Sequence, residues 1–160
     1  AIRDKYTYDG EEFSVIVPAD ITDIIHEGRC LGHCIDTTDR YFDRIQHRIT
    51  YLVFLRRSSQ KDVPYYTLEI EPGGTIRQQR TTGNNQNKAD VKAYSSFIHE
   101  WQRVVRERIS EEDRGLAEVS RQTRIREYQE LRDKQEKVWR GALAGKLLVD
   151  VLEADLIEAI

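Results

Sequence analysis

The sequence predicts an α+β fold: a small, mainly antiparallel sheet of about four strands, packed with helices and followed by a charged C-terminal helical extension. Three observations lead to this prediction. Residues 49–55 are apolar at both parities, as in a strand that is covered on both faces. Residues 65–71 alternate between apolar and polar, and a Pro-Gly-Gly turn joins them to residues 75–81. Residues 88–108 carry apolar side chains at helical spacing.

The first elements of the chain are short. Residues 13–17 predict a short strand that ends at Pro18, which favours an edge position in the sheet. Asp20 is a suitable N-cap for a helix over residues 20–34. This helix either runs to Cys34 or breaks at Gly32. Residues 41–47 predict a second short helix.

The Pro-Gly-Gly turn decides which side chains share a face of the sheet. A three-residue loop with one glycine in the left-handed region places Ile76 on the apolar side. It also sets Arg77 opposite Glu69, and Gln79 opposite Thr67. A two-residue loop would move Ile76 to the polar side, so we choose the longer loop because it buries the isoleucine and pairs opposite charges. The expected result is a polar stripe on the sheet.

The C-terminal half predicts two kinds of helix. Asn87 can cap a helix over residues 88–108, whose apolar stripe should lie across one face of the sheet. Residues 110–140 are mostly charged and predict a long, solvated helix or helix pair. Residues 146–160 are apolar and acidic, and either fold back on the long helix or dock elsewhere.

This change in composition divides the chain. We expect an α+β core over residues 1–108 and a charged helical extension over residues 109–160.

Composition limits the classes of function. The chain has 160 residues, a third of them charged, and a net charge of -3, which argues against a generally basic nucleic-acid binder. Neither a membrane-spanning run nor a signal peptide is visible, so we expect a cytoplasmic protein without a membrane partner. The absence of methionine suggests a piece of a longer protein.

Four potential metal ligands lie close together in sequence: His26, Cys30, His33 and Cys34. On one helix they would span about 12 Å, whereas the ligands of one zinc lie within about 4 Å of one another. Three could bind only if the helix breaks near Gly32. We therefore favour a structural role and predict neither a metal nor a cofactor.

Two further patterns allow a structural and a functional interpretation. Glu69 and Glu71 lie on one strand face, where carboxylates do acid/base chemistry less often than they pair with arginine. The arginines of residues 103–140 alternate with acids almost one for one. A solvated helix face is favoured there, although nucleic acid stays open as a partner.

An ordered set of short motifs resembles the PcfJ-like family of conjugative plasmids, phages and related mobile elements. The motifs are Glu27 to Ile35, Tyr41, the "YLVFLR" run from Tyr51 to Arg56, Tyr65 to Ile70, Gln79-Arg80, Gly83-Asn84-Asn85, Val91 and Trp101. The resemblance covers roughly residues 13–105. It implies a mobile-element context. Its motifs also contain several polar residues.

These polar residues, with those of the stripe, give the candidate site. The candidate catalytic residues are His33, Glu69 and Gln79, and the candidate ligand-binding residues are Arg56, Thr67, Arg77 and Asn84. Gathered on the sheet beneath the 20–34 helix, they would suit a phosphate-containing or nucleotide ligand.

Three functions remain open. The first is a mobile-element accessory or interaction domain that binds a protein partner through the helical tail, residues 109–160. The second is an enzyme acting on nucleic acid or a nucleotide, with His33 and Glu69 as acid/base groups and Arg56 as the anion partner. The third is a structural oligomerisation module, with the oligomeric state left open.

Overall fold

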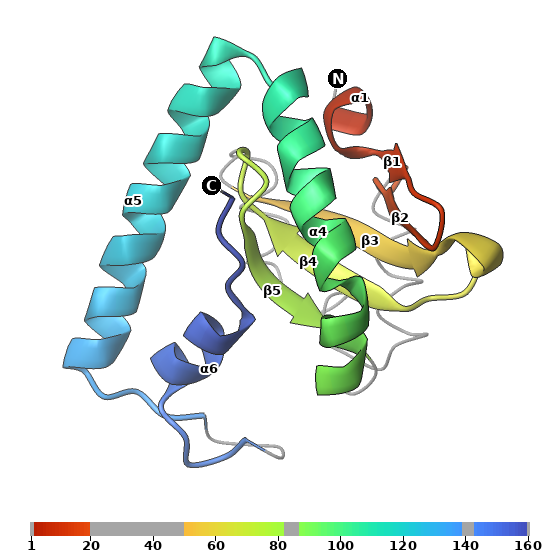
Figure 1. Ribbon diagram of the computed structural model, residues 1–160. Coiled ribbons are helices and arrows are strands. Elements are labelled where there is room, and N and C mark those ends of the chain that lie inside the picture. The colour runs from red at the N-terminus through yellow and green to blue at the C-terminus, as the bar shows by residue number, and fades with distance from the viewer. Residues whose placement is uncertain (1, 20–49, 82–86, 139–142, 160) are drawn as a thin grey trace.

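A five-stranded antiparallel sheet forms the centre of the molecule (Figure 1). The computed structural model describes residues 2–19, 50–81, 87–138 and 143–159. Within them the strands follow chain order: β1 (Tyr8–Asp9), β2 (Phe13–Ile16), β3 (Tyr51–Arg57), β4 (Tyr66–Ile70) and β5 (Ile76–Arg80). The α+β class is confirmed. The predicted count of about four strands is one too low, because β1 folds back on β2 after the turn at Gly10.

Helices occupy the flanks of the sheet. The described elements are α1 (Ile2–Tyr6), the 3₁₀ turn η2 (Ser58–Gln60), α4 (Lys88–Arg108), α5 (Glu111–Asp133) and α6 (Leu148–Asp155). The helices predicted over residues 20–34 and 41–47 lie outside the described residues. None of the helices in the described ranges combines the length and the apolar character needed to cross a membrane.

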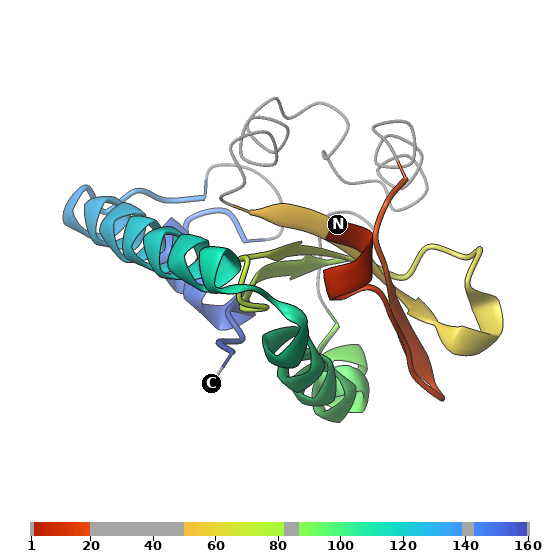
Figure 2. The ribbon, with the colours of Figure 1, turned by 90° about the horizontal axis from the view of Figure 1, so that it is seen from above.

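Helix α4 covers one face of the sheet, as its apolar stripe predicts (Figure 2). Its buried side chains are Tyr94, Ile98, Trp101, Gln102 and Val105. The predicted cap is confirmed, because the Asn87 side chain accepts hydrogen bonds from the backbone N–H groups of Ala89 and Asp90. The main hydrophobic core therefore lies between α4 and the sheet.

The hairpin between β4 and β5 has the predicted three-residue loop. The Glu71 N–H donates to the Thr75 carbonyl at 2.8 Å, and Gly74 adopts a φ of 95° in the left-handed region. Ile76 consequently pairs with Ile70, and both side chains are buried in the core.

Beyond Ile76 the predicted register is wrong, because the strand contains a β-bulge. Arg77 is the extra residue, so Gln78 pairs with Glu69 and Gln79 pairs with Leu68. Without the bulge, Gln78 and Arg80 would share the apolar face with Ile76. The bulge sends both of these polar side chains to the opposite face and leaves Ile76 and Gln79 on the side of α4.

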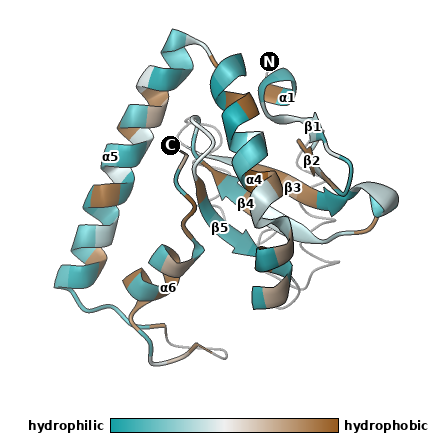
Figure 3. Ribbon diagram, in the orientation of Figure 1, coloured by the Kyte–Doolittle hydropathy of each residue, from teal (hydrophilic) through white to brown (hydrophobic). Residues whose placement is uncertain are grey.

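The C-terminal segment packs back onto the edge of the sheet. A capping box formed by Ser110 and Asp113 starts α5, and the chain returns through α6 (Figure 1). Ile157 then exchanges two backbone hydrogen bonds of 2.9 Å with Ile76 on β5. Most of α5 is hydrophilic, with scattered apolar bands (Figure 3). The division at residue 108 stays a prediction, and the extension contributes a backbone partner to the last strand.

Candidate functional site

Thr67 and Glu69 lie on the same face of the sheet, opposite to the face covered by α4. Their cross-strand neighbours are Arg80 and Gln78, and the Gln78 amide donates to the Glu69 carboxylate at 3.2 Å. Both Thr67 and Glu69 are buried. The polar stripe therefore exists, but with Gln78 and Arg80 as its β5 members.

Gln79 lies on the other face and does not join this group. Its side-chain oxygen accepts a hydrogen bond from the Tyr94 hydroxyl, and its amide donates to the Asp155 carbonyl at 2.9 Å. With 1% of its surface exposed, Gln79 connects α4, β5 and the end of α6. The expectation that Gln79 shares a pocket with Thr67 and Glu69 is wrong, and the β-bulge is the cause.

Arg77 forms an ion pair with Glu71 and not with Glu69. The Arg77 Nε lies 2.8 Å from a Glu71 carboxylate oxygen, which also accepts from the Arg124 Nε at 2.7 Å. Arg77 further donates to the Ser120 carbonyl at 2.8 Å. All three ionic side chains are at most 5% exposed, so this buried cluster fastens α5 to the sheet.

Arg56 lies at the far end of β3. Its guanidinium donates to the Lys61 carbonyl at 2.7 Å and lies 5.1 Å from the centre of the Phe54 ring. It lines a pocket of about 570 Å³ with Arg3, Lys61 and several apolar residues. This pocket is separate from the Arg77 cluster.

His33 and Asn84, together with the cluster His26, Cys30, His33 and Cys34, lie outside the described residues. Among the residues that the structure does describe, no group of three or more histidine, cysteine or acidic side chains has a geometry that could hold a metal ion.

Buried tyrosines hold the first turn of α4 against the sheet. The Tyr66 hydroxyl donates to the Asp90 carboxylate at 3.1 Å and accepts from the Asn87 N–H at 3.0 Å. Burial raises the pKa of Tyr66 to about 12, and burial followed by the Asp90 carboxylate raises the pKa of Tyr65 to about 12. Both phenols therefore stay protonated near neutral pH.

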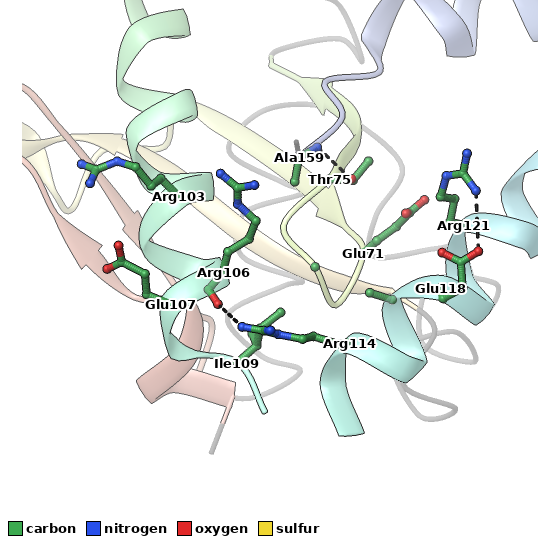
Figure 4. Close-up of a pocket in the computed structure, with 12 residues that line it drawn as sticks. Glu71, Thr75, Arg103, Arg106, Glu107, Ile109, Arg114, Glu118, Arg121 and Ala159 are labelled. Atoms are coloured by element: carbon green, nitrogen blue, oxygen red, sulfur yellow. Dashed lines mark hydrogen bonds and ion pairs between the residues drawn. The ribbon is translucent and has the colours of Figure 1, made fainter. Parts of the chain in front are cut away.

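A larger cleft lies where the end of α4, the start of α5 and the β4–β5 hairpin meet. Its volume is about 620 Å³. Figure 4 shows the side chains that line it. The described lining residues are Glu71, Gly73, Thr75, Arg103, Arg106, Glu107, Ile109, Arg114, Ala117, Glu118, Arg121 and Ala159. Four of the twelve are arginines, two from each helix, and we call this site the arginine cleft.

The four arginines of the arginine cleft differ in how strongly they are held. All are exposed. Arg114 donates to the Arg106 carbonyl at 3.0 Å, and Arg121 lies 3.6 Å from the Glu118 carboxylate. Among the described residues, the guanidinium groups of Arg103 and Arg106 have no ion pair, and Figure 4 shows both extending from α4. At least two cationic groups of the cleft are thus available to a ligand.

Close packing and buried charge keep the two walls of the arginine cleft in place. A Cβ on Gly73 would lie 3.1 Å from the Ala117 Cβ, so the hairpin turn approaches α5 closely. Lys5 on α1 lies 2.6 Å from the Asp113 carboxylate at the start of α5. Burial alone would raise the pKa of Asp113, but hydrogen bonds from Lys5 and Ser110 outweigh it and lower this pKa.

The lining favours binding of an anion over acid/base catalysis. Guanidinium groups are permanent cations and fork-shaped donors that match phosphate and carboxylate oxygens. None of the described lining residues is a histidine, a cysteine or an aromatic residue. None of the lining residues was among the candidate catalytic or ligand-binding residues predicted from the sequence. The four arginines lie in the stretch 103–140, where a solvated helix face was favoured over contact with nucleic acid because the arginines alternate with acids along the chain. Only a spacing that places basic residues on facing helices could have indicated it.

Comparisons with known proteins give a family and one distant relative. The family model described as "PcfJ-like protein" matches residues 3–94, more than half of the chain. "Uncharacterized protein Lin1253/Lin1744" of Listeria innocua is 29% identical over 82 residues, which cover 51% of this chain and 18% of that protein. The chain thus spans less than a fifth of that relative's length. No solved structure matches the chain.

Proposed function

Because this chain belongs to the PcfJ-like protein family, we propose that it is an accessory interaction domain of a mobile genetic element, such as a conjugative plasmid or a phage. In this proposal the domain acts in the cytoplasm and binds its partner in the arginine cleft. The helical extension takes part directly, since α5 supplies one wall of that cleft.

A single observation carries the proposal: two consecutive helices of different character, α4 and α5, place four exposed arginines around one cleft. Helix α4 belongs to the hydrophobic core, whereas α5 is mostly charged. An arginine that only keeps a helix face soluble has no reason to converge with others on a cavity. A binding site needs this convergence, because several weak surface contacts must act on the same ligand.

The buried cluster of Arg77, Glu71 and Arg124 supports the same proposal. It ties α5 to the sheet, and α5 is the helix that forms one wall of the cleft and carries two of its exposed arginines. A wall fixed in this way loses little conformational entropy when a ligand binds.

The test replaces the four cleft arginines, Arg103, Arg106, Arg114 and Arg121, by glutamine in the element that encodes the protein. The readout is transfer frequency for a plasmid, or phage yield for a phage. We expect the variant to behave like a deletion of the gene while the protein keeps its normal level and melting temperature.

A matched control removes the same number of positive charges elsewhere. Lys88, Lys92, Arg126 and Lys134 are all exposed and do not line the cleft. Their replacement by glutamine should leave the element's function unchanged. Normal transfer or phage yield with the cleft variant would contradict the proposal, as would an equal loss with the control.

A further inference from the structure

We infer that the ligand of the arginine cleft is single-stranded nucleic acid, held by its sugar-phosphate backbone. This inference rests on the proposed function, because it names the chemical class of the partner that the cleft receives. It follows from the size of the cleft, the side chains that line it and those that the described lining lacks.

The size of the cleft limits the ligand. A volume of about 620 Å³ lies in the range typical of small-ligand sites and suits a few nucleotides of a flexible strand. A duplex, whose persistence length is about 150 base pairs, is too stiff to fold into a space of this volume. The exposed arginine heads leave the cleft open to solvent, as a chain that enters and leaves requires.

The lining favours phosphate over an acidic peptide. Seven of the twelve described lining residues are charged, and the apolar ones are small except for Ile109. Peptide-binding sites generally bury aromatic or large aliphatic anchors, whereas nucleic-acid interfaces are more polar and more positively charged. The cationic lining residues are all arginine, whose fork pairs with two phosphate oxygens at once.

The described lining also indicates which part of the nucleic acid is bound. It contains no aromatic side chain on which a base could stack, and no amide side chain that could read a base edge. Contacts to phosphates position a strand without reading its sequence. We therefore expect binding that is independent of sequence and strongly dependent on salt.

The acidic residues of the cleft provide a further test of the inference. Glu71 is neutralised by Arg77 and Arg124, whereas Glu107 and Glu118 are exposed and line the same cleft as the arginines. Both exposed carboxylates repel a polyanion. Replacing either by glutamine should tighten the binding of a nucleic acid by roughly 1.5- to 5-fold.

The experiment measures fluorescence anisotropy of a labelled oligothymidylate of about 12 nucleotides with the purified chain. Between about 50 mM and about 200 mM salt, the slope of log K against log salt should be about -3, which is the value for four phosphate contacts to a single strand. Each single arginine-to-glutamine substitution in the cleft should reduce this slope by about 0.7. The fourfold cleft variant should bind at least tenfold more weakly, and the fourfold control variant should bind like the original chain.

Competitors separate the sources of negative charge. A duplex of the same length, polyglutamate and inorganic tripolyphosphate should each displace the oligonucleotide less well than unlabelled oligothymidylate does. The inference is overturned if any of them competes equally well, if the control variant loses as much affinity as the cleft variant, or if Glu107→Gln weakens binding.

The two proposals can fail separately. If the cleft variant abolishes transfer or phage yield but the chain binds no oligonucleotide, the interaction domain stands and its ligand is of another class. If the oligonucleotide binds in the cleft but the element works normally with the cleft variant, the ligand class stands and the proposed function is wrong.

Discussion

Replacing Glu71 by glutamine should destabilise the fold more than any surface change near the arginine cleft. One oxygen of Glu71 accepts from the Nε atoms of Arg77 and Arg124, at 2.8 Å and 2.7 Å. The three side chains are 3%, 3% and 5% exposed. Glutamine keeps the size and one acceptor oxygen but removes the negative charge between two buried cations.

The remaining partners of the two arginines indicate the size of the effect. Arg77 would keep the Ser120 carbonyl and Glu127 at 3.7 Å, and Arg124 would keep Glu158 at 3.8 Å. Glu127 and Glu158 are 38% and 54% exposed, so water weakens both pairs. Removing one member of a buried ionic cluster costs about 3–5 kcal/mol. For a chain of this length, each kcal/mol lowers the melting temperature by about 2–4 °C, so the expected loss is roughly 6–20 °C.

Thermal unfolding followed by circular dichroism measures this difference. Glu118→Gln is the control, since Glu118 also pairs with an arginine, at 3.6 Å, but on the surface. Its effect should stay within about 0.5 kcal/mol. A Glu71→Gln melting temperature within the range of the control would refute the view that buried charge fastens α5 to the sheet.

Two further substitutions test other parts of the fold. Asp113→Asn should lose about 1–2 kcal/mol at neutral pH, because the capping box and the Lys5 pair are both weakened. The pKa of Asp113 is lowered in the folded state, so its contribution is present above the unfolded value of 3.8 and disappears as the pH falls below it. The difference between the urea midpoints of the two proteins should therefore shrink progressively as the pH falls below 3.8, and a constant difference would contradict this assignment. Gln79→Leu should lose about 1–3 kcal/mol in urea unfolding, because the buried Tyr94 hydroxyl loses its acceptor. Unchanged stability would show that the fold does not need this hydrogen bond, and Gln79 would again be a candidate for a functional role.

Local chemistry in the sequence was sufficient to predict most elements of the fold. Apolar spacing predicted α4, the Asn87 cap predicted its start, and the Pro-Gly-Gly turn predicted a left-handed glycine at the hairpin. These features depend on residues within a few positions of one another, so the sequence contains the whole interaction.

The candidate site could be predicted only in part. Thr67 and Glu69 share a face as expected, because alternation along one strand is a local property. The bulge at Arg77 was not predicted, since it depends on the fit of Gln78, Gln79 and Arg80 to two different environments across the sheet. That single extra residue moved Gln79 to the other face.

The amino-acid sequence by itself determined the class of fold, the hairpin and the family of this protein, because each of these follows from neighbouring residues or from an ordered set of short motifs. Tertiary structure alone decided which arginines are buried and which are exposed around a common cleft. Along the chain, Arg77, Arg103, Arg114 and Arg124 look alike. The packing of α5 against the hairpin gives two of them a buried carboxylate and leaves the other two facing solvent.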